Sequence, residues 1–277
     1  MDVRYSTDPE GFTALPTQAL RKMFLIDNLF APDDVPMTYC DIDRSITGSA
    51  VPVKKALTLL ATRKEMAAEY FAERREIGVI NIGNEGTIGV DGKVYAMAHK
   101  DALYIGRGVR TIEFKSTSAE KPAKFYFVSY PAHKEYPTAH ALFANADRSS
   151  LGSQRDANKR TINRLIHAKG IQSCQLVMGL TELEEGSVWN TMPPHTHQRR
   201  SEVYMYYNVA PDAMVIHLMG QMGETRHLIM HNEQAVLNPS WSIHAGVGTR
   251  HYSFIWAMGG ENQVFDDMDG ITVKELR

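Results

Sequence analysis

Residues 78–114 decide the fold class; they read GVINIGNEGTIGVDGKVYAMAHKDALYIGRGVRTIEF. Short runs of β-branched and aromatic residues alternate here with Gly and Asp-Gly, which is typical of strands joined by tight turns. Asp91-Gly92 lies between apolar runs and predicts a two-residue hairpin turn, because such turns need positive φ angles. Gly106-Arg107-Gly108 marks a second tight bend. Many short strands at this spacing indicate an all-β sandwich or barrel.

The same pattern returns in the second half of the chain, which predicts two copies of one β domain. The block ERREIGVINIG aligns with RRSEVYMYYNV and sets Glu76 against Glu202. The block DALYIGRGV aligns with PSWSIHAGV and sets Gly108 against Gly246. We therefore expect two all-β domains, residues 1–150 and residues 151–277.

Two segments do not follow this strand pattern. Residues 54–76 have the length and composition of a helix, with an untidy apolar period that also allows a strand to begin near Tyr70. Residues 131–163 are turn-rich and polar and are predicted to form a connection.

Composition excludes several classes of protein. The chain has 277 residues, 43% of them apolar and 22% charged, which is ordinary for a globular protein. Lys and Arg total 30 against 32 for Asp and Glu, so charge favours neither nucleic acid nor an anionic membrane as partner. Two cysteines are too few for a disulfide framework, and no signal peptide or transmembrane run is evident. We expect a cytoplasmic protein with no nucleic-acid or membrane partner.

The sharpest chemical signal is PPHTHQRRSE, residues 193–202. Because residues two apart on a strand face the same side, His195 and His197 can present both imidazoles to one point. A turn after them can bring Glu202 back on the next strand, and His244 can supply a fourth ligand from a later strand. Three neutral imidazoles and one carboxylate suit zinc, iron, manganese or nickel and leave positions open for a substrate.

Aromatic and histidine side chains near this motif are further candidates. Tyr204 and Tyr206 have the same strand parity as Glu202 and are expected to turn toward the metal, as possible catalytic or substrate-contacting groups. His217 and His227 lie on predicted strands of the second half and could line its cavity. The alternative for each is an ordinary core or surface residue.

Longer blocks of this sequence carry a resemblance. H-x-H-x4-E followed by a distant His, with Gly186 before it, resembles the cupin metal motif. The blocks KRTIN, MGLTELEEGSVWNTMPPHTH, ETRHLIMHNEQAV, PSWSIHAGVGT and FIWAMGGENQVFDDMD resemble the 5-keto-4-deoxyuronate isomerase family, and the likeness covers nearly the whole chain. It implies two tandem cupin (double-stranded β-helix, or jelly-roll) barrels with short flanking helices and a homo-oligomer, often a hexamer. It also implies one zinc ion per chain, held by His195, His197, Glu202 and His244.

The resemblance implies a ketol-isomerase, that is, an intramolecular oxidoreductase. Its substrate would be a small uronate, 5-dehydro-4-deoxy-D-glucuronate, converted to 3-deoxy-D-glycero-2,5-hexodiulosonate in pectin and uronate breakdown. A metal can polarise the carbonyl and its neighbouring hydroxyl, and a base must move the proton. That base stays open between a tyrosine, a further carboxylate and a hydroxide on the metal. The substrate carboxylate needs an Arg partner, for which Arg160 and Arg226 are candidates.

Only the second half is expected to bind metal. The repeat alignment sets His195 and His197 against Glu69 and Phe71, and His244 against Gly106. One carboxylate without imidazoles is a poor transition-metal site, and Phe71 is expected to fill the interior of the first barrel.

Two other functions fit the cupin motif. A cupin dioxygenase also holds iron(II) with three His and one Glu, and it would consume oxygen. A non-catalytic sugar-binding cupin would bind without turnover and would usually carry a DNA-binding segment, which this sequence does not show.

Overall fold

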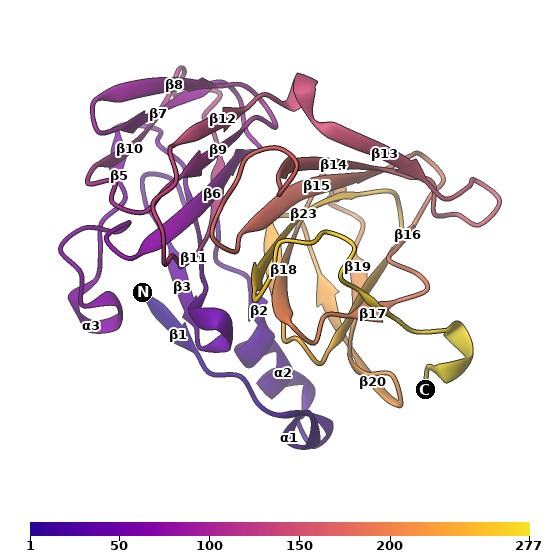
Figure 1. The fold of residues 1–277 in the computed structure, drawn as a ribbon. Coiled ribbons are helices and arrows are strands. Elements are labelled where there is room, and N and C mark those ends of the chain that lie inside the picture. Colours follow the sequence, from indigo (N-terminus) through magenta and orange to yellow (C-terminus); the bar gives the residue numbers. More distant parts are fainter. The chain divides into compact units, whose positions relative to one another are not determined.

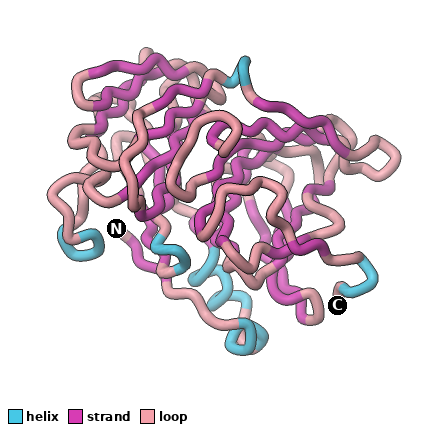
Figure 2. Tube along the Cα trace, in the orientation of Figure 1, coloured by secondary structure: helices cyan, strands magenta, loops and turns pink.

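The computed structural model describes residues 1–277, and strands dominate it (Figure 2). The chain forms two compact units, each assembled from separate stretches of sequence. The first unit comprises residues 1–4, 28–146 and 165–177, and the second comprises residues 5–27, 147–164 and 178–277. The division into domains 1–150 and 151–277 stays a prediction.

The first unit contains a seven-stranded sheet and a four-stranded sheet (Figure 1). The seven strands, in spatial order, are β1 (Asp2–Arg4), β3 (Met37–Cys40), β4 (Ile46–Ala50), β11 (Phe125–Pro131), β6 (Arg75–Asn81), β9 (Ala102–Ile105) and β12 (Ala139–Ala141). The four strands are β5 (Leu57–Thr58), β10 (Ile112–Ser116), β7 (Gly86–Val90) and β8 (Lys93–Met97).

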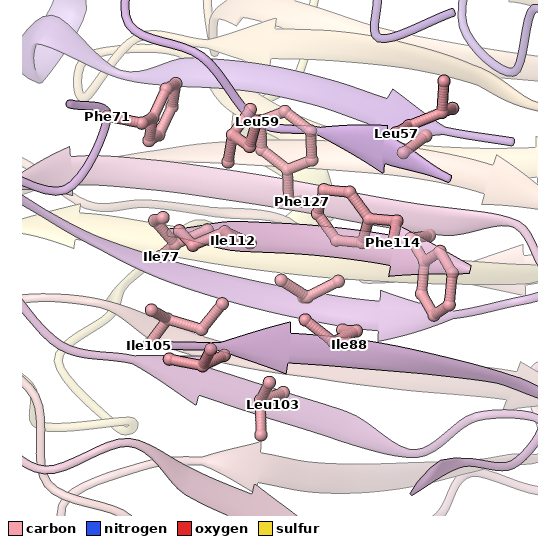
Figure 3. Close-up of a cluster of buried hydrophobic side chains, with 14 of the residues drawn as sticks. Leu57, Leu59, Phe71, Ile77, Ile88, Leu103, Ile105, Ile112, Phe114 and Phe127 are labelled. Atoms are coloured by element: carbon pink, nitrogen blue, oxygen red, sulfur yellow. The ribbon is translucent and has the colours of Figure 1, made fainter. Parts of the chain in front are cut away.

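Side chains from both of these sheets meet in one apolar core (Figure 3). Ile77 enters it from β6, and Ile112 and Phe114 enter it from β10. Ile112 and Phe114 are two residues apart, so both side chains point to the same side of β10 and meet those of β6. The two sheets therefore pack face to face. Phe71 is 2% exposed in this core, and its ring stands edge-on to Phe127 with centroids 6.0 Å apart. The prediction that Phe71 fills this interior is confirmed.

The second unit repeats this plan. Its seven strands, in order, are β13 (Asp147–Leu151), β14 (Arg160–Ile166), β15 (Val177–Leu183), β23 (Ser253–Gly260), β18 (Arg200–Tyr207), β21 (Gln234–Asn238) and β2 (Leu25–Ile26). Its four-stranded sheet has the order β16 (Trp189–Asn190), β22 (Ile243–Gly248), β19 (Val215–Gln221) and β20 (Glu224–Met230). A further pair joins β17 (His195–Thr196) to β24 (Asp269–Gly270).

Helices are few and short. They are α1 (Pro9–Thr13), α2 (Thr17–Phe24) and α3 (Arg63–Met66), with 3-10 turns at Ile42–Arg44, Phe143–Asn145 and Val273–Glu275. None has the length and apolar character needed to cross a membrane. The all-β prediction is therefore confirmed. Its finer form, two barrels, is not, because no sheet closes on itself: two facing sheets bury their apolar faces without closing the hydrogen-bond ladder.

Two local predictions hold only in part. Within residues 54–76 only α3 is helical, and it ends where Ala67 adopts a left-handed conformation with φ 47°. Within residues 131–163 the chain forms β12 and β13 and enters β14 rather than a plain connection. β13 is not recognisable as a strand from its polar sequence. It is an edge strand paired on one side only, and such a strand can expose its side chains.

The two halves do repeat in topology, but the predicted alignment is wrong by one residue. Ile77 pairs with Ile105, the last residue of β9, just as Glu202 pairs with Asn238, the last residue of β21. Ile77 is therefore the counterpart of Glu202, and Glu76 lies on the opposite face of its strand. A shift of one residue moves every side chain to the other face of the strand, so the predicted alignment matched an inward-facing residue with an outward-facing one.

The second predicted alignment is also wrong. β9 lies beside β6 in the seven-stranded sheet, so its counterpart is β21. The strand with His244, β22, lies between β16 and β19, and its counterpart is β10 between β5 and β7. The match of Gly106 with His244 is thereby removed. The inward-facing residues of β10 are Ile112 and Phe114, which are both apolar.

The predicted hairpin at Asp91-Gly92 is confirmed, and it supplies a test of the backbone. φ is 45° at Asp91 and 84° at Gly92, and no atom lies within 4 Å of a Cβ built on Gly92. Gly92→Ala should lower the free energy of unfolding by about 1–2 kcal/mol through backbone strain alone. Gly223, in the turn between β19 and β20, has the same open space without a left-handed φ. In urea unfolding Gly223→Ala should therefore be close to neutral, and equal losses would contradict this account.

The same turn predicts a pH dependence. The Asp91 carboxylate accepts hydrogen bonds from the Arg110 and Thr111 N–H groups and the Thr111 hydroxyl. Slight burial raises the pKa of Asp91, but these bonds outweigh it and hold the pKa below its usual value. A lowered pKa stabilises the fold above the ordinary carboxyl pKa of about 3.9, and the gain disappears as pH falls. Asp91→Asn should be less stable than wild type at pH 7, with a gap that closes toward pH 2. A gap independent of pH in thermal unfolding would refute this.

Candidate metal centre

The four predicted ligands come from three strands of the second unit. His195 opens β17, His197 follows it, Glu202 lies on β18 and His244 lies on β22. A turn at residues 198–199 reverses the chain between β17 and β18, as predicted from the spacing of His197 and Glu202. His197, Glu202 and His244 are buried and His195 is half-buried.

Their ligand atoms converge. His195 Nε2 lies 3.0 Å from His197 Nε2 and 3.1 Å from His244 Nε2. Glu202 Oε2 lies 3.1 Å from His197 Nε2 and 2.8 Å from His244 Nε2. Ligand atoms bound at roughly 2.0–2.2 Å to one ion stand about 2.8–3.5 Å apart, so this group has the spacing of a metal shell. The chemistry of the donor set fits as well.

Protonation also suits a metal. Burial, together with His244 and His197, lowers the pKa of His195 to about 2, which leaves its imidazole neutral. Burial alone would raise the pKa of Glu202, but His244 and His197 hold it below its usual range. His197 Nδ1–H donates to the Asp267 carbonyl at 2.9 Å, which leaves the Nε2 lone pair facing the other ligands. Deprotonated ligands of this kind are what a divalent metal requires.

The C-terminal segment, residues 261–277, holds the histidine loop in place. Buried Arg200 donates to the carbonyls of Val264, Phe265 and Asp267 at 2.6–3.1 Å. Arg199 forms ion pairs with the carboxylates of Asp267 and Asp269. The backbone that carries His195 and His197 is thus tied to a segment about 70 residues further along the chain.

A cavity of about 320 Å³ opens beside three of the four ligands, within the second unit. Most of its lining comes from alternate residues of neighbouring strands, because one face of the seven-stranded sheet forms its floor. These residues are Ser149 and Leu151 on β13, Arg160, Ile162 and Arg164 on β14, Thr181 on β15, Glu202 and Tyr204 on β18, and Phe254, Trp256 and Met258 on β23. Asn190, Thr191 and Pro193, with Phe265, Asp266 and Met268, complete it.

Of the two predicted arginines, only Arg160 lines this cavity. Burial lowers the pKa of Arg160, and its Nη1 donates to the Asn158 carbonyl. Arg226 lies elsewhere, where its guanidinium donates to the carbonyls of Thr13 and Leu15. It supports the connection between α1 and α2, and the structure does not bring it to the cavity.

The two candidate tyrosines also separate. Tyr204 lines the cavity, and its hydroxyl lies 3.2 Å from Thr191 Oγ1. Tyr206 is fully buried, and its hydroxyl donates to Nδ1 of His217 at 2.7 Å. Burial lowers the pKa of His217 to about 3 and keeps it neutral in the core, whereas His227 is exposed. Neither of these histidines lines the cavity.

Sequence reasoning missed several lining residues. Arg164 follows Arg160 at the spacing of one strand face, but this signal was hidden because residues 131–163 were predicted to form a connection rather than a strand. The contributions of Asn190, Thr191 and Asp266 have no comparable signal, because they depend on how distant loops meet.

Solved structures with the same fold come from several proteins. The chain is similar to an IolB-like protein from Salmonella typhimurium, with TM-score 0.72, 10% identity, and coverage of 90% of this chain and 96% of that one. It is also similar to a variant of oxalate decarboxylase from Bacillus subtilis, with TM-score 0.56, 10% identity, and coverage of 79% and 70%. At such identities the likeness concerns the fold alone, which is cupin-like.

Curated relatives match along their whole length. The chain is 52% identical over 277 residues to the 4-deoxy-L-threo-5-hexosulose-uronate ketol-isomerase of Caldicellulosiruptor bescii, covering 100% of both chains. It is 51% identical over 278 residues to the enzyme of that name from Escherichia coli O139:H28, again covering 100% of both. The model of one family matches residues 31–273. This chain therefore belongs to the KduI/IolB family.

Proposed function

We propose that this protein is a metal-dependent ketol-isomerase that converts 4-deoxy-L-threo-5-hexosulose uronate to 3-deoxy-D-glycero-2,5-hexodiulosonate in pectin and uronate catabolism. Full-length identity of 52% to an isomerase of that name supports the reaction. One observation carries the link to chemistry: a single cavity is lined by three of the four proposed ligands, His195, His197 and Glu202, and by the half-buried Arg160. A ketol isomerisation needs both a site that polarises two adjacent oxygens and a partner for the uronate carboxylate.

His195, His197, Glu202 and His244 would hold the ion, and we propose that it is zinc, one per chain. When bound, the ion would supply Lewis-acid polarisation of the substrate carbonyl and the neighbouring hydroxyl. Three imidazoles with one carboxylate also suit iron(II), manganese and nickel, so the choice of zinc rests on the family resemblance.

The remaining cavity residues orient the substrate. We assign the uronate carboxylate to Arg160, with Arg164 four residues further along on the same strand face. Burial raises the pKa of Tyr204 well above its usual value, so its hydroxyl keeps a proton at neutral pH. Among the catalytic candidates, Tyr204 therefore suits a proton donor rather than a base, and Tyr206 lies outside the cavity.

His195→Ala, His197→Ala and His244→Ala should each lose metal and turnover together, because each removes one proposed ligand. Even changes around the ligands commonly cost about 10–100-fold in metal affinity or activity, so these losses should be at least as large. NMR of the product formed from 4-deoxy-L-threo-5-hexosulose uronate, with metal content measured in parallel, is the test. Wild-type rates should be equal with and without oxygen. Oxygen uptake would support the dioxygenase alternative, and full turnover by metal-free His195→Ala would refute metal catalysis.

We also propose two cupin-type domains, residues 1–150 as scaffold and residues 151–277 as the metal-binding domain. The counterpart of Glu202 in the first unit is Ile77, and the counterpart of β22 points Ile112 and Phe114 inward. Glu76, on the other face, is already engaged: its carboxylate accepts hydrogen bonds from the Tyr104 hydroxyl and from the N–H groups of Cys174, Gln175 and Leu176. These contacts give Glu76 a role in holding the chain together rather than in binding an ion.

Elemental analysis of the saturated protein should find one ion per chain. Glu76→Gln should keep that ion and lose stability, because a neutral amide replaces a buried carboxylate that accepts four hydrogen bonds. His195→Ala should lose the ion and keep most of its stability. Two ions per chain, or loss of the ion in Glu76→Gln, would contradict the assignment.

Two further proposals concern assembly and location. The family resemblance favours a homo-oligomer, with a hexamer as the state it implies. Cysteine usage, with Cys40 and Cys174 both free, favours a cytoplasmic location.

A further inference from the structure

We propose that Asn190 recognises the substrate: its Nδ2 donates a hydrogen bond to the oxygen of the reacting carbonyl and stabilises the charge that develops there. The inference rests on the proposed function and deepens it by adding a residue to the same site. It stands on an unpartnered buried donor, a hydrogen-bond chain that orients this donor, and local backbone strain.

The Asn190 side chain acts on the Tyr204 hydroxyl, but its Nδ2 forms no hydrogen bond of good geometry within the protein. Asn190 is 2% exposed, lines the cavity, and has no hydrogen bond to Nδ2. A buried amide N–H without a partner costs free energy. Among the buried side-chain atoms without a partner, only Asn190 Nδ2 belongs to a residue that lines this cavity, where a ligand can complete the pairing. The cavity lined by Asn190 is also lined by His195, His197 and Glu202.

A short chain of hydrogen bonds fixes the orientation of this amide. Thr191 Oγ1 donates to Asn190 Oδ1 at 2.9 Å. Thr191 Oγ1 also lies 3.2 Å from the Tyr204 hydroxyl, from which it can accept. Each hydroxyl proton then has an acceptor, Oδ1 is occupied, and Nδ2 is the atom left for a ligand.

The backbone at this point is strained. Thr191 has φ 53°, a left-handed conformation that is unfavourable for a β-branched residue. Asn190 itself is fixed by pairing with Gly246, so the strain begins at the strand end. Strain of this kind persists where surrounding contacts impose it, commonly at functional sites. Here it brings the Thr191 hydroxyl back onto Asn190.

The chemistry gives this donor a defined task. When the proton leaves the carbon next to a carbonyl, negative charge moves onto the carbonyl oxygen. A neutral, pre-oriented N–H in a buried cavity stabilises that charge more than it stabilises the uncharged ground state. Asn190 should therefore affect kcat more than KM.

The test compares Asn190→Leu and Asn190→Asp with wild type on 4-deoxy-L-threo-5-hexosulose uronate. Asn190→Leu should lower kcat about 100-fold or more, the usual loss for one such donor, with little change in KM. Because it removes an unpartnered donor together with the acceptor for Thr191 Oγ1, these two effects oppose each other and the Tm of the metal-free protein should change little. Asn190→Asp keeps the shape and the acceptor for Thr191 but replaces the donor, and it should be equally impaired.

Two comparisons distinguish a role of Thr191 and Asn190 in orienting the donor from a role in stabilising the fold. Thr191→Val should lower kcat by freeing the amide, and Thr191→Ser should restore most of the loss. Asn81 is a buried asparagine of the first unit whose Nδ2 has carbonyl partners, at Asn84 and Met97. Asn81→Ser should therefore show the opposite result, a lower Tm with unchanged turnover per folded molecule.

Each outcome decides. Near wild-type kcat in Asn190→Leu overturns the proposal, as does a fall in Tm that accounts for the lost activity. Should Asn190→Leu not fold, Asn190→Asp decides, and an active Asn190→Asp would show that the substrate needs no donor there. An inactive wild-type protein would instead refute the proposed function.

Discussion

Glu202 pairs across its sheet with Asn238 on β21 and with Met258 on β23, and the candidate site depends on this register. It places Glu202 and Tyr204 on the face that lines the cavity. A shift of one residue would turn both away and bring Val203 inward. The side chains of β14 and β23 that complete the cavity alternate in the same way. The geometry of the site is therefore set by the hydrogen-bond register of the seven-stranded sheet.

Electrostatics then sets the cost of the arrangement. Three imidazole nitrogens and a carboxylate oxygen lie about 3 Å apart in a largely buried place, where their lone pairs repel and their solvation is lost. A cation bound between these atoms would offset both the repulsion between the lone pairs and the loss of solvation. The histidine loop is held by other bonds, chiefly from Arg200 to carbonyls of the C-terminal segment.

The two units show how one topology serves two purposes. Both set a seven-stranded sheet beside a four-stranded sheet with matching strand orders. In the first unit the inward positions of β6 and β10 hold apolar residues such as Ile77 and Ile112, and the interior packs as a core. In the second, Glu202 and His244 occupy the corresponding strands. Buried polar atoms without a partner occur in both units, but among them only Asn190 Nδ2 belongs to a residue that lines the cavity beside the proposed ligands.

The sequence by itself determined the features that depend on neighbouring residues. The hairpin at Asp91-Gly92 follows from the φ requirement of its turn, and the convergence of His195, His197 and Glu202 follows from strand alternation and one short reversal. The resemblance, carried by long blocks, supported His244 as the fourth ligand and added the reaction. The hairpin and the ligand motif are signals carried by neighbouring residues, and the resemblance is a signal carried by many residues along the chain.

Tertiary structure decided what depends on pairing between distant segments. It made Ile77, rather than Glu76, the counterpart of Glu202 in the first unit. Strand register is fixed by the partner strands, and a weak sequence likeness does not define it to one residue. It made the polar residues 147–151 a strand, and it separated Arg160 from Arg226. It also brought Asn190 to the cavity. Each of these depends on contacts across many residues of sequence, which no local pattern encodes.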